Sequence, residues 1–141
     1  MMKTKTHGFT LIELLIAIVI VGILVSMAVP SYQGMIQKSR RSDAKIALEK
    51  AAVLQEQHYF ANNAFAISVN NLGGTGGVLL SPEGHYTVTA AVSGNTYTLT
   101  ATALSSSPQS EDEDCQTLTL DNTGERTSQN GSGGDSTSIC F

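Results

Sequence analysis

A single apolar run near the N-terminus limits what this chain can fold into. It extends from Phe9 to Val29, 21 residues with one charged side chain, Glu13. A helix rising about 1.5 Å per residue would make this run roughly 31 Å long, close to the hydrocarbon thickness of a bilayer. The rest of the 141-residue chain has no comparable run and is rich in Ser, Thr, Gly and Asn. The sequence therefore predicts one membrane-spanning helix joined to one small domain.

Charges beside the run suggest its orientation. Lys3 and Lys5 precede it, and such a positive flank stays cytoplasmic, so the residues after the run should be exported. An ordinary secretory signal peptide is the alternative, because Ser26-Met27-Ala28 has the small-x-small form of a cleavage site. The helical pattern continues past Pro30, so that cleavage would cut one long helix in two, and we favour retention of the run.

Glu13 is costly inside an apolar run. On insertion scales a carboxylate at the bilayer centre costs about 2.5–3.5 kcal/mol, and less near an end, and such residues are usually paired and functional. No basic residue lies within the run. The partner of Glu13 should therefore lie outside this helix or be created by processing.

The residues around Gly8 carry a specific resemblance. Gly8-Phe9-Thr10-Leu11-Ile12-Glu13, with a charged leader before it and a full apolar run after it, resembles the processing site of type IV pilins and related pseudopilins. The resemblance implies that a prepilin peptidase cleaves between Gly8 and Phe9 and methylates Phe9. It also implies that Glu13 pairs with the N-terminal ammonium of a neighbouring subunit during assembly.

The helix is expected to bend after the run. Pro30 removes a backbone donor and should kink it, and Gly22 is a second weak point. In type IV pilins, which this arrangement resembles, the segment between such residues can unwind in the filament. From 31 to 62 the pattern stays helical, and Asn62-Asn63 is the expected stop. Its apolar face is made of alanines and leucines: Ala44, Ala47, Leu48, Ala51, Ala52 and Leu54.

Five basic residues lie along the same helix: Lys38, Arg40, Arg41, Lys45 and Lys50. We interpret the charged positions as a solvated face, with contact to the acidic heads of adjacent subunits as the alternative. The segment from Arg41 to Ala44, with Gln55-Glu56 and Tyr59 later, resembles PilE-like minor pilins of the type IVa class.

The remaining residues, 63–141, read as a β-rich head. Residues 63–83 have loop composition, and Gly73-Gly74-Thr75-Gly76-Gly77 suggests a flexible connection. A two-residue period follows and predicts a hairpin, a third strand at 116–120 and a fourth at 125–128. The expected fold is α+β: a long N-terminal helix, kinked near Pro30, packed on a four-stranded antiparallel sheet.

Two cysteines, Cys115 and Cys140, lie near the C-terminal end of the sequence. In an exported protein they should form one disulfide, whereas in a cytosolic protein they would be free thiols. The resemblance implies the disulfide-bounded C-terminal loop of type IVa pilins.

Residues that could carry chemistry are sparse. His58 and His85 are isolated and are interpreted as surface or packing residues, and no cofactor or metal motif is present. The run Glu111–Asp114 could bind Ca²⁺ but is more typical of a solvated loop. From residue 61 onward the chain has eight acidic residues and one basic residue. Since DNA binding needs clustered Lys and Arg, no direct nucleic-acid binding is expected.

These observations and the resemblance predict four segments: a leader (1–8), a transmembrane and filament-core helix (9–30), an amphipathic stem helix (31–62) and a globular head (63–141). The expected function is structural rather than enzymatic: a minor subunit of a bacterial type IV pilus, with roles in adhesion and twitching motility. The expected location is the inner membrane, crossed once with the C-terminus in the periplasm, and then the extracellular filament. The expected partners are other pilins, the prepilin peptidase, the membrane and the pilus assembly machinery.

Three alternatives remain open at this point. The first is a pseudopilin of a type II secretion system, although major pseudopilins typically carry a tryptophan-containing, calcium-associated loop and this chain has no tryptophan. The second is a DNA-uptake pilin. The third is a membrane-tethered or secreted enzyme or binding module.

Overall fold

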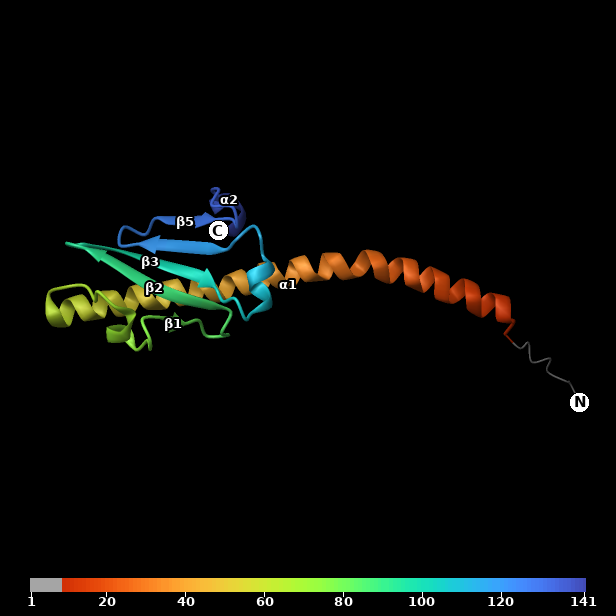
Figure 1. The fold of residues 1–141 in the computed structure, drawn as a ribbon, viewed down its shortest axis with the longest axis horizontal. Helices are drawn as coiled ribbons and strands as arrows, with labels where there is room; N and C mark the ends of the chain where they lie inside the picture. The colour runs from red at the N-terminus through yellow and green to blue at the C-terminus, as the bar shows by residue number, and fades with distance from the viewer. Residues whose placement is uncertain (1–8) are drawn as a thin grey trace, which may run out of the picture. The chain divides into compact units, whose positions relative to one another are not determined.

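The computed structural model describes residues 9–141, so Gly8 and the predicted leader lie outside the described residues. Figure 1 shows the long helix α1 (Leu11–Asn62) and the antiparallel sheet that follows it in the chain. Residues 37–141 form one compact unit, called the C-terminal unit below. Residues 9–28 are called the apolar segment.

Helix α1 runs through Gly22 and Pro30 without interruption. The bend and the unwinding expected at these residues stay predictions. The helix ends at Asn62, as expected: Asn63 adopts a left-handed φ of 54°, and its amide donates a 2.8 Å hydrogen bond to the Tyr59 carbonyl. This arrangement is typical of a helix C-terminus.

The sheet has five strands, all antiparallel and in sequence order. They are β1 (Leu79–Leu80), β2 (Tyr86–Ser93), β3 (Thr96–Ala103), β4 (Thr117–Asp121) and β5 (Arg126–Gln129). Three short helices complete the unit: η1 (Val69–Leu72), η2 (Pro108–Glu111) and α2 (Thr137–Cys140).

The prediction of four strands was wrong by one. Strand β1 pairs Leu79 with Val88 and Leu80 with Thr87, within the segment expected to be a loop. A two-residue strand shows no period in the sequence, and it follows a glycine-rich stretch, so local pattern could not reveal it. The α+β fold itself, with α1 on an antiparallel sheet, is confirmed.

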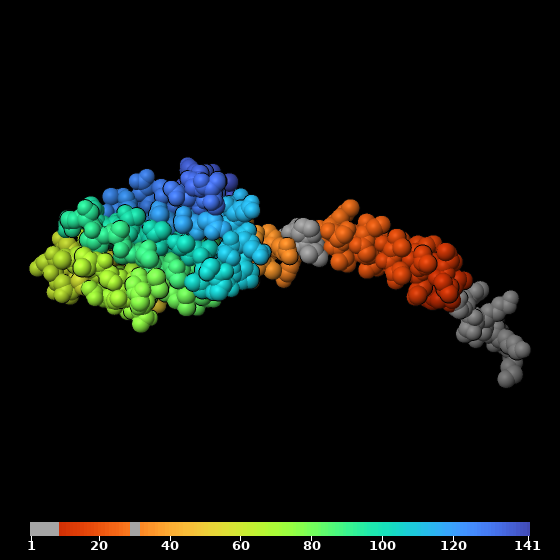
Figure 2. Space-filling model, in the orientation of Figure 1, coloured from red at the N-terminus to blue at the C-terminus, as the bar shows by residue number. Residues whose placement is uncertain are grey.

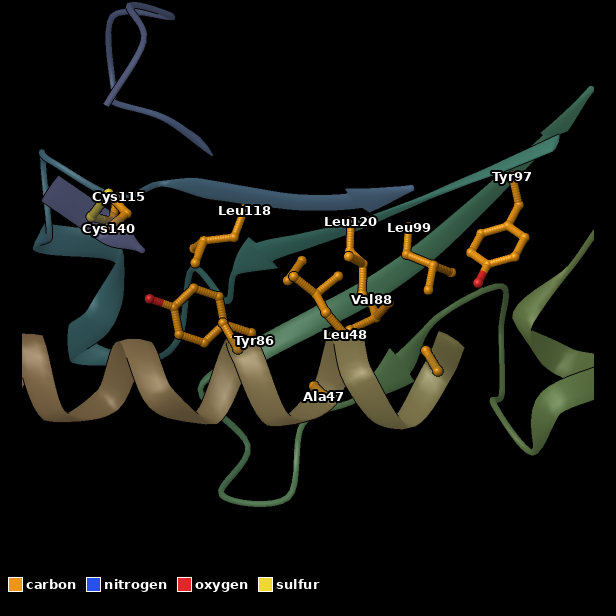
Figure 3. Packing of buried hydrophobic residues seen from close by; sticks show 13 residues of the cluster. Ala47, Leu48, Tyr86, Val88, Tyr97, Leu99, Cys115, Leu118, Leu120 and Cys140 are labelled. Atoms are coloured by element: carbon orange, nitrogen blue, oxygen red, sulfur yellow. A yellow bond between two sulfur atoms is a disulfide. The ribbon is translucent and has the colours of Figure 1, made fainter. Parts of the chain in front are cut away.

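The core lies between α1 and one face of the sheet (Figure 3). Small residues on α1 let the helix backbone approach the strands closely, while larger side chains from the sheet fill the space. The buried residues include Ala44, Ala47, Leu48 and Ala51 from α1, and Tyr86, Val88, Leu99, Ala101, Leu118 and Leu120 from the strands. The predicted apolar face is thus the buried face, with Ala52 and Leu54 partly buried at its margin.

Gly74 packs against backbone so tightly that a side chain would not fit. A Cβ atom there would lie 2.6 Å from the Val78 carbonyl oxygen and 2.8 Å from that of Val69. Gly74→Ala should therefore destabilise the C-terminal unit by about 1–3 kcal/mol, the usual cost of overpacking. Urea unfolding followed by circular dichroism measures this. Gly34→Ala is the matched control, because a Cβ at Gly34 meets no atom within 4 Å, and it should not destabilise the protein.

Candidate assembly site and the polar clamp of the C-terminal unit

The apolar segment has no cover among the described residues. Every residue from Phe9 to Ala28 is exposed, and Figure 2 draws this segment in red to orange. In the described part of the chain, α1 is the one helix long and apolar enough to cross a membrane. Such a surface is stable only in lipid or against other apolar helices.

Glu13 lies in the first turn of α1, where the helix dipole favours a carboxylate and so reduces its cost. Its backbone amide donates to the Thr10 hydroxyl at 3.3 Å, so Thr10 caps the helix, and Thr10-Leu11-Ile12-Glu13 has the spacing of a capping box. Among residues 9–141 the Glu13 carboxylate makes no ion pair, so it is available to a group outside this chain's described part.

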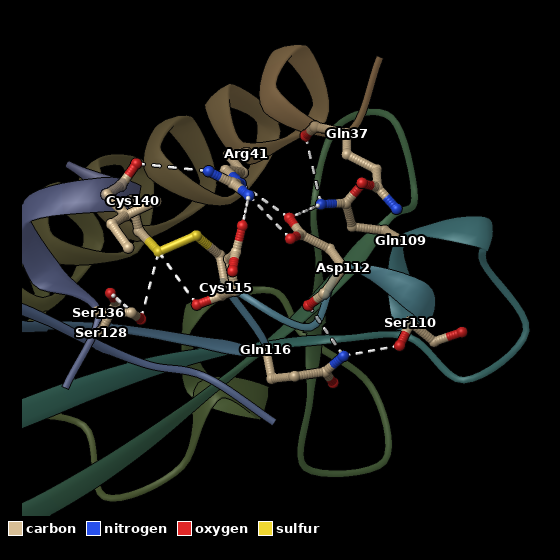
Figure 4. Close-up of polar contacts among 12 residues, drawn as sticks. Gln37, Arg41, Gln109, Ser110, Asp112, Cys115, Gln116, Ser128, Ser136 and Cys140 are labelled. Atoms are coloured by element: carbon tan, nitrogen blue, oxygen red, sulfur yellow. Dashed lines mark hydrogen bonds and ion pairs between the residues drawn. A yellow bond between two sulfur atoms is a disulfide. The ribbon is translucent and has the colours of Figure 1, made fainter. Parts of the chain in front are cut away.

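A buried ion pair joins α1 to the loop before β4 (Figure 4). Arg41 donates from Nε to Asp112 Oδ2 and from Nη2 to Asp112 Oδ1, each at 2.8 Å, and the Asp112 side chain is only 2% exposed. Asp114 accepts a longer bond of 3.4 Å from the same guanidinium. Hydrogen bonding to Asp112 raises the pKa of Arg41 above its ordinary value. We call this arrangement the polar clamp.

Gln109 extends the polar clamp to the backbone of α1. Its Nε2 donates to Asp112 Oδ2 at 2.7 Å and to the Gln37 carbonyl at 3.3 Å. Gln109 Oε1 and the Tyr86 hydroxyl are the buried side-chain polar atoms in the described residues that have no hydrogen-bond partner. Burial raises the pKa of Tyr86 to about 12, so its hydroxyl stays neutral.

A second buried carboxylate holds the segment between β1 and β2. Asp43 accepts from the Ser81 hydroxyl at 2.5 Å, from the Glu83 amide at 3.0 Å and from the His85 amide at 3.3 Å. His85 Nδ1 in turn lies 2.9 Å from the Ser107 hydroxyl, which caps η2. Asp43 therefore positions backbone rather than a ligand.

The predicted disulfide between Cys115 and Cys140 is confirmed, and both cysteines are buried. The loop that it closes contains β4, β5 and α2. The bridge thus ties the end of α2 to the segment just before β4, beside the polar clamp (Figure 4).

Two family profiles match this chain. One, described as "Type IV minor pilin ComP, DNA uptake sequence receptor", matches residues 30–119. The other, "Prokaryotic N-terminal methylation motif", matches residues 3–29. The first match covers more than half of the chain. The chain belongs to the type IV pilin family.

Curated relatives of this pilin are fimbrial and pilin proteins, which are structural rather than enzymatic. It is 34% identical to the fimbrial protein EcpC of Eikenella corrodens over 121 residues, covering 73% of this chain and 79% of that protein. It is 36% identical to the type IV major pilin protein PilE1 of Neisseria gonorrhoeae over 112 residues, covering 78% of this chain but only 65% of that protein. A solved type IV pilin from Shewanella oneidensis is 26% identical and covers 64% of this chain and 89% of that one, with a TM-score of 0.45.

Sequence reasoning missed the polar clamp of this pilin. The sequence predicts a solvated run at Glu111–Asp114, and this prediction is wrong for Asp112, which is buried against Arg41. The interpretation of the stem's charged positions as a solvated face is likewise wrong for Arg41, which is buried, and the acidic Asp43 on the same helix is buried as well. Arg41 and Asp112 are 71 residues apart, and no local pattern signals such a pairing.

Proposed function

We propose that this chain is a minor structural subunit of a bacterial type IV pilus. The observation that carries the proposal is the uncovered apolar segment with Glu13 in the first turn of α1. Lipid covers this surface before assembly, and the apolar segments of neighbouring subunits cover it in the filament. The family profile named for a minor pilin supports the minor role.

Processing prepares this pilin for assembly. The prepilin peptidase cleaves between Gly8 and Phe9 and methylates the new amine of Phe9, which keeps its positive charge. Before assembly the subunit crosses the inner membrane once, with its C-terminal unit in the periplasm, where the disulfide is maintained. The assembly machinery then extracts it into the filament, through which it takes part in adhesion and twitching motility.

The Glu13 carboxylate pairs with the Phe9 ammonium of a neighbour in this proposal. Glu13→Ala should leave cleavage intact and reduce the amount of the protein in sheared filaments by at least about tenfold, because close interfacial charge pairs contribute strongly to binding. Immunoblotting of sheared filaments measures incorporation, and N-terminal mass spectrometry measures cleavage. Glu125→Ala, at an exposed turn residue, is the control and should be incorporated normally.

Two results would contradict this proposal, one in part and one as a whole. Normal incorporation of Glu13→Ala would overturn the pairing of Glu13 with Phe9 of a neighbour. A mature N-terminus at Val29 would show an ordinary signal peptide and exclude a pilin. Immunogold labelling tests the minor role, which predicts rare or tip-restricted label rather than label along the shaft.

Direct DNA recognition is the second candidate, because the matching profile is named for a DNA uptake sequence receptor. Charge opposes it: residues 37–141 hold six basic and eleven acidic residues. Of the six, Arg41 and Arg126 are already paired with carboxylates. The purified pilin should therefore show no sequence-specific mobility shift with duplex DNA at physiological salt, and a specific shift would establish this second function.

A further inference from the structure

A small cleft lies between α1 and the β4–β5 end of the sheet, and nothing above assigns it a role. Its volume is about 110 Å³. Leu48, Leu120 and Phe141 form its apolar part, and Lys45, Glu49 and Arg126 its charged part. The cleft thus combines an apolar floor with charged groups at its edge.

Of the two positive side chains in the cleft, Arg126 has a carboxylate partner and Lys45 has none among the described residues. Arg126 Nη2 lies 2.5 Å from Glu49 Oε1, so these two form an ion pair. Lys45 Nζ lies 5.3 Å from the centre of the Phe141 ring, and no carboxylate of the described residues lies within ion-pair distance of it. Partial burial, followed by the positive charges of Arg126, Arg41 and Lys38, lowers the pKa of Lys45. A carboxylate entering the cleft would relieve this accumulated positive charge.

The same chain presents carboxylates that have no cation of their own. Glu111 and Glu113 are exposed and make no ion pair among the described residues, whereas their neighbours Asp112 and Asp114 are held by Arg41. A pilin of this kind therefore carries both halves of a charge-complementary contact. Neither half is paired with an opposite charge within the described part of one subunit.

We propose that this cleft receives an acidic side chain of the neighbouring pilin subunit. The carboxylate of that side chain pairs with Lys45, and its aliphatic carbons cover the apolar floor. This inference rests on the proposed function, because the neighbour exists only in the filament. A DNA phosphate backbone fits less well, since Glu49 lines the cleft and the surrounding C-terminal unit is net acidic.

Carbodiimide cross-linking of intact sheared filaments tests the contact directly. The reagent joins a lysine amine to a carboxylate only where the two touch, so mass spectrometry should find Lys45 linked to a Glu or Asp of another pilin subunit. Lys45→Arg keeps the positive charge but cannot form the amide. That variant should be incorporated at close to the normal level and lack the cross-link.

Charge reversal provides the second measurement. Lys45→Glu should lower incorporation into filaments by about tenfold relative to its amount in the membrane, because a like charge would face the neighbour's carboxylate. Lys50→Glu is the matched control: it makes the same charge change at an exposed position of α1 outside the cleft, and incorporation should stay within about twofold.

The possible outcomes separate the inference from the proposed function. Filaments that contain the chain but yield no cross-link at Lys45, or that tolerate Lys45→Glu as well as Lys50→Glu, would overturn the inference alone. Protection of Lys45 from acetylation by added DNA, but not by filament assembly, would also overturn it and assign the cleft to phosphate. Absence of the wild-type chain from filaments would overturn the proposed function, and the inference with it.

Discussion

Arg41→Leu should lower the free energy of unfolding of the C-terminal unit by about 3–5 kcal/mol, the usual cost of breaking a buried ion pair by removing one partner. Asp112 would then keep one short side-chain bond, from Gln109, while its carboxylate remained 2% exposed. The loop that carries Asp112 would lose its main tie to α1. Urea unfolding in detergent, followed by the near-ultraviolet circular dichroism of the tyrosines, measures the change.

Two further variants test the reason for this loss. Replacing both Arg41 and Asp112 with leucine should restore part of the stability, because the uncompensated buried charge is removed along with its partner. Arg126→Ala breaks the exposed pair with Glu49 and should cost at most about 1 kcal/mol. If Arg41→Leu cost no more than Arg126→Ala, the polar clamp would be irrelevant to stability.

Features of this pilin that depend on neighbours in the sequence could be predicted from the sequence. The apolar segment is visible as an uninterrupted run, and β2 and β3 appear as a two-residue period around a Ser93-Gly94-Asn95 turn. The disulfide was predictable because two cysteines allow only one intramolecular pairing. The processing motif was recognisable because Gly8 and Glu13 stand at a fixed spacing.

Features that depend on distant contacts could not be predicted. Strand β1 exists because Leu79 and Leu80 meet the edge of β2, not because of any local pattern. Asp43 and Arg41 looked like surface charges on an amphipathic helix, yet both are buried because loops from the sheet fold over them. A charged residue beside an alanine face can therefore face the interior, and only the tertiary structure distinguishes the two positions.

The capping arrangement at Thr10 concerns the backbone of Glu13 rather than its carboxylate. The Thr10 hydroxyl accepts from the Glu13 amide, and Glu13→Ala keeps that amide. Loss of the cap requires Thr10→Ala, which should cost about 1 kcal/mol of helix stability and leave incorporation nearly unchanged. A large loss of incorporation in Glu13→Ala would therefore report on the carboxylate and not on the cap.

Removing the disulfide is the second large expected effect. The double variant Cys115→Ala/Cys140→Ala should lose about 3.5 kcal/mol of stability, because the bridge closes a loop with a sequence separation of 25 residues and restricts the unfolded chain. The loss should fall on the loop that contains β4, β5 and α2. Urea unfolding of the oxidised parent and the double variant measures the difference in free energy.

Amide hydrogen exchange then shows where the loss is located. Amides of β5, the edge strand next to β4, should lose protection, while those of β2 and β3 should keep it until global unfolding. Arg41 also donates to the Ile139 carbonyl at 3.4 Å, so the polar clamp retains a weak hold on α2 without the bridge. If the double variant lost less than about 1 kcal/mol, pairing of β5 with β4 and this hold would suffice to fix the loop, and the chain-entropy estimate would not apply to this pilin.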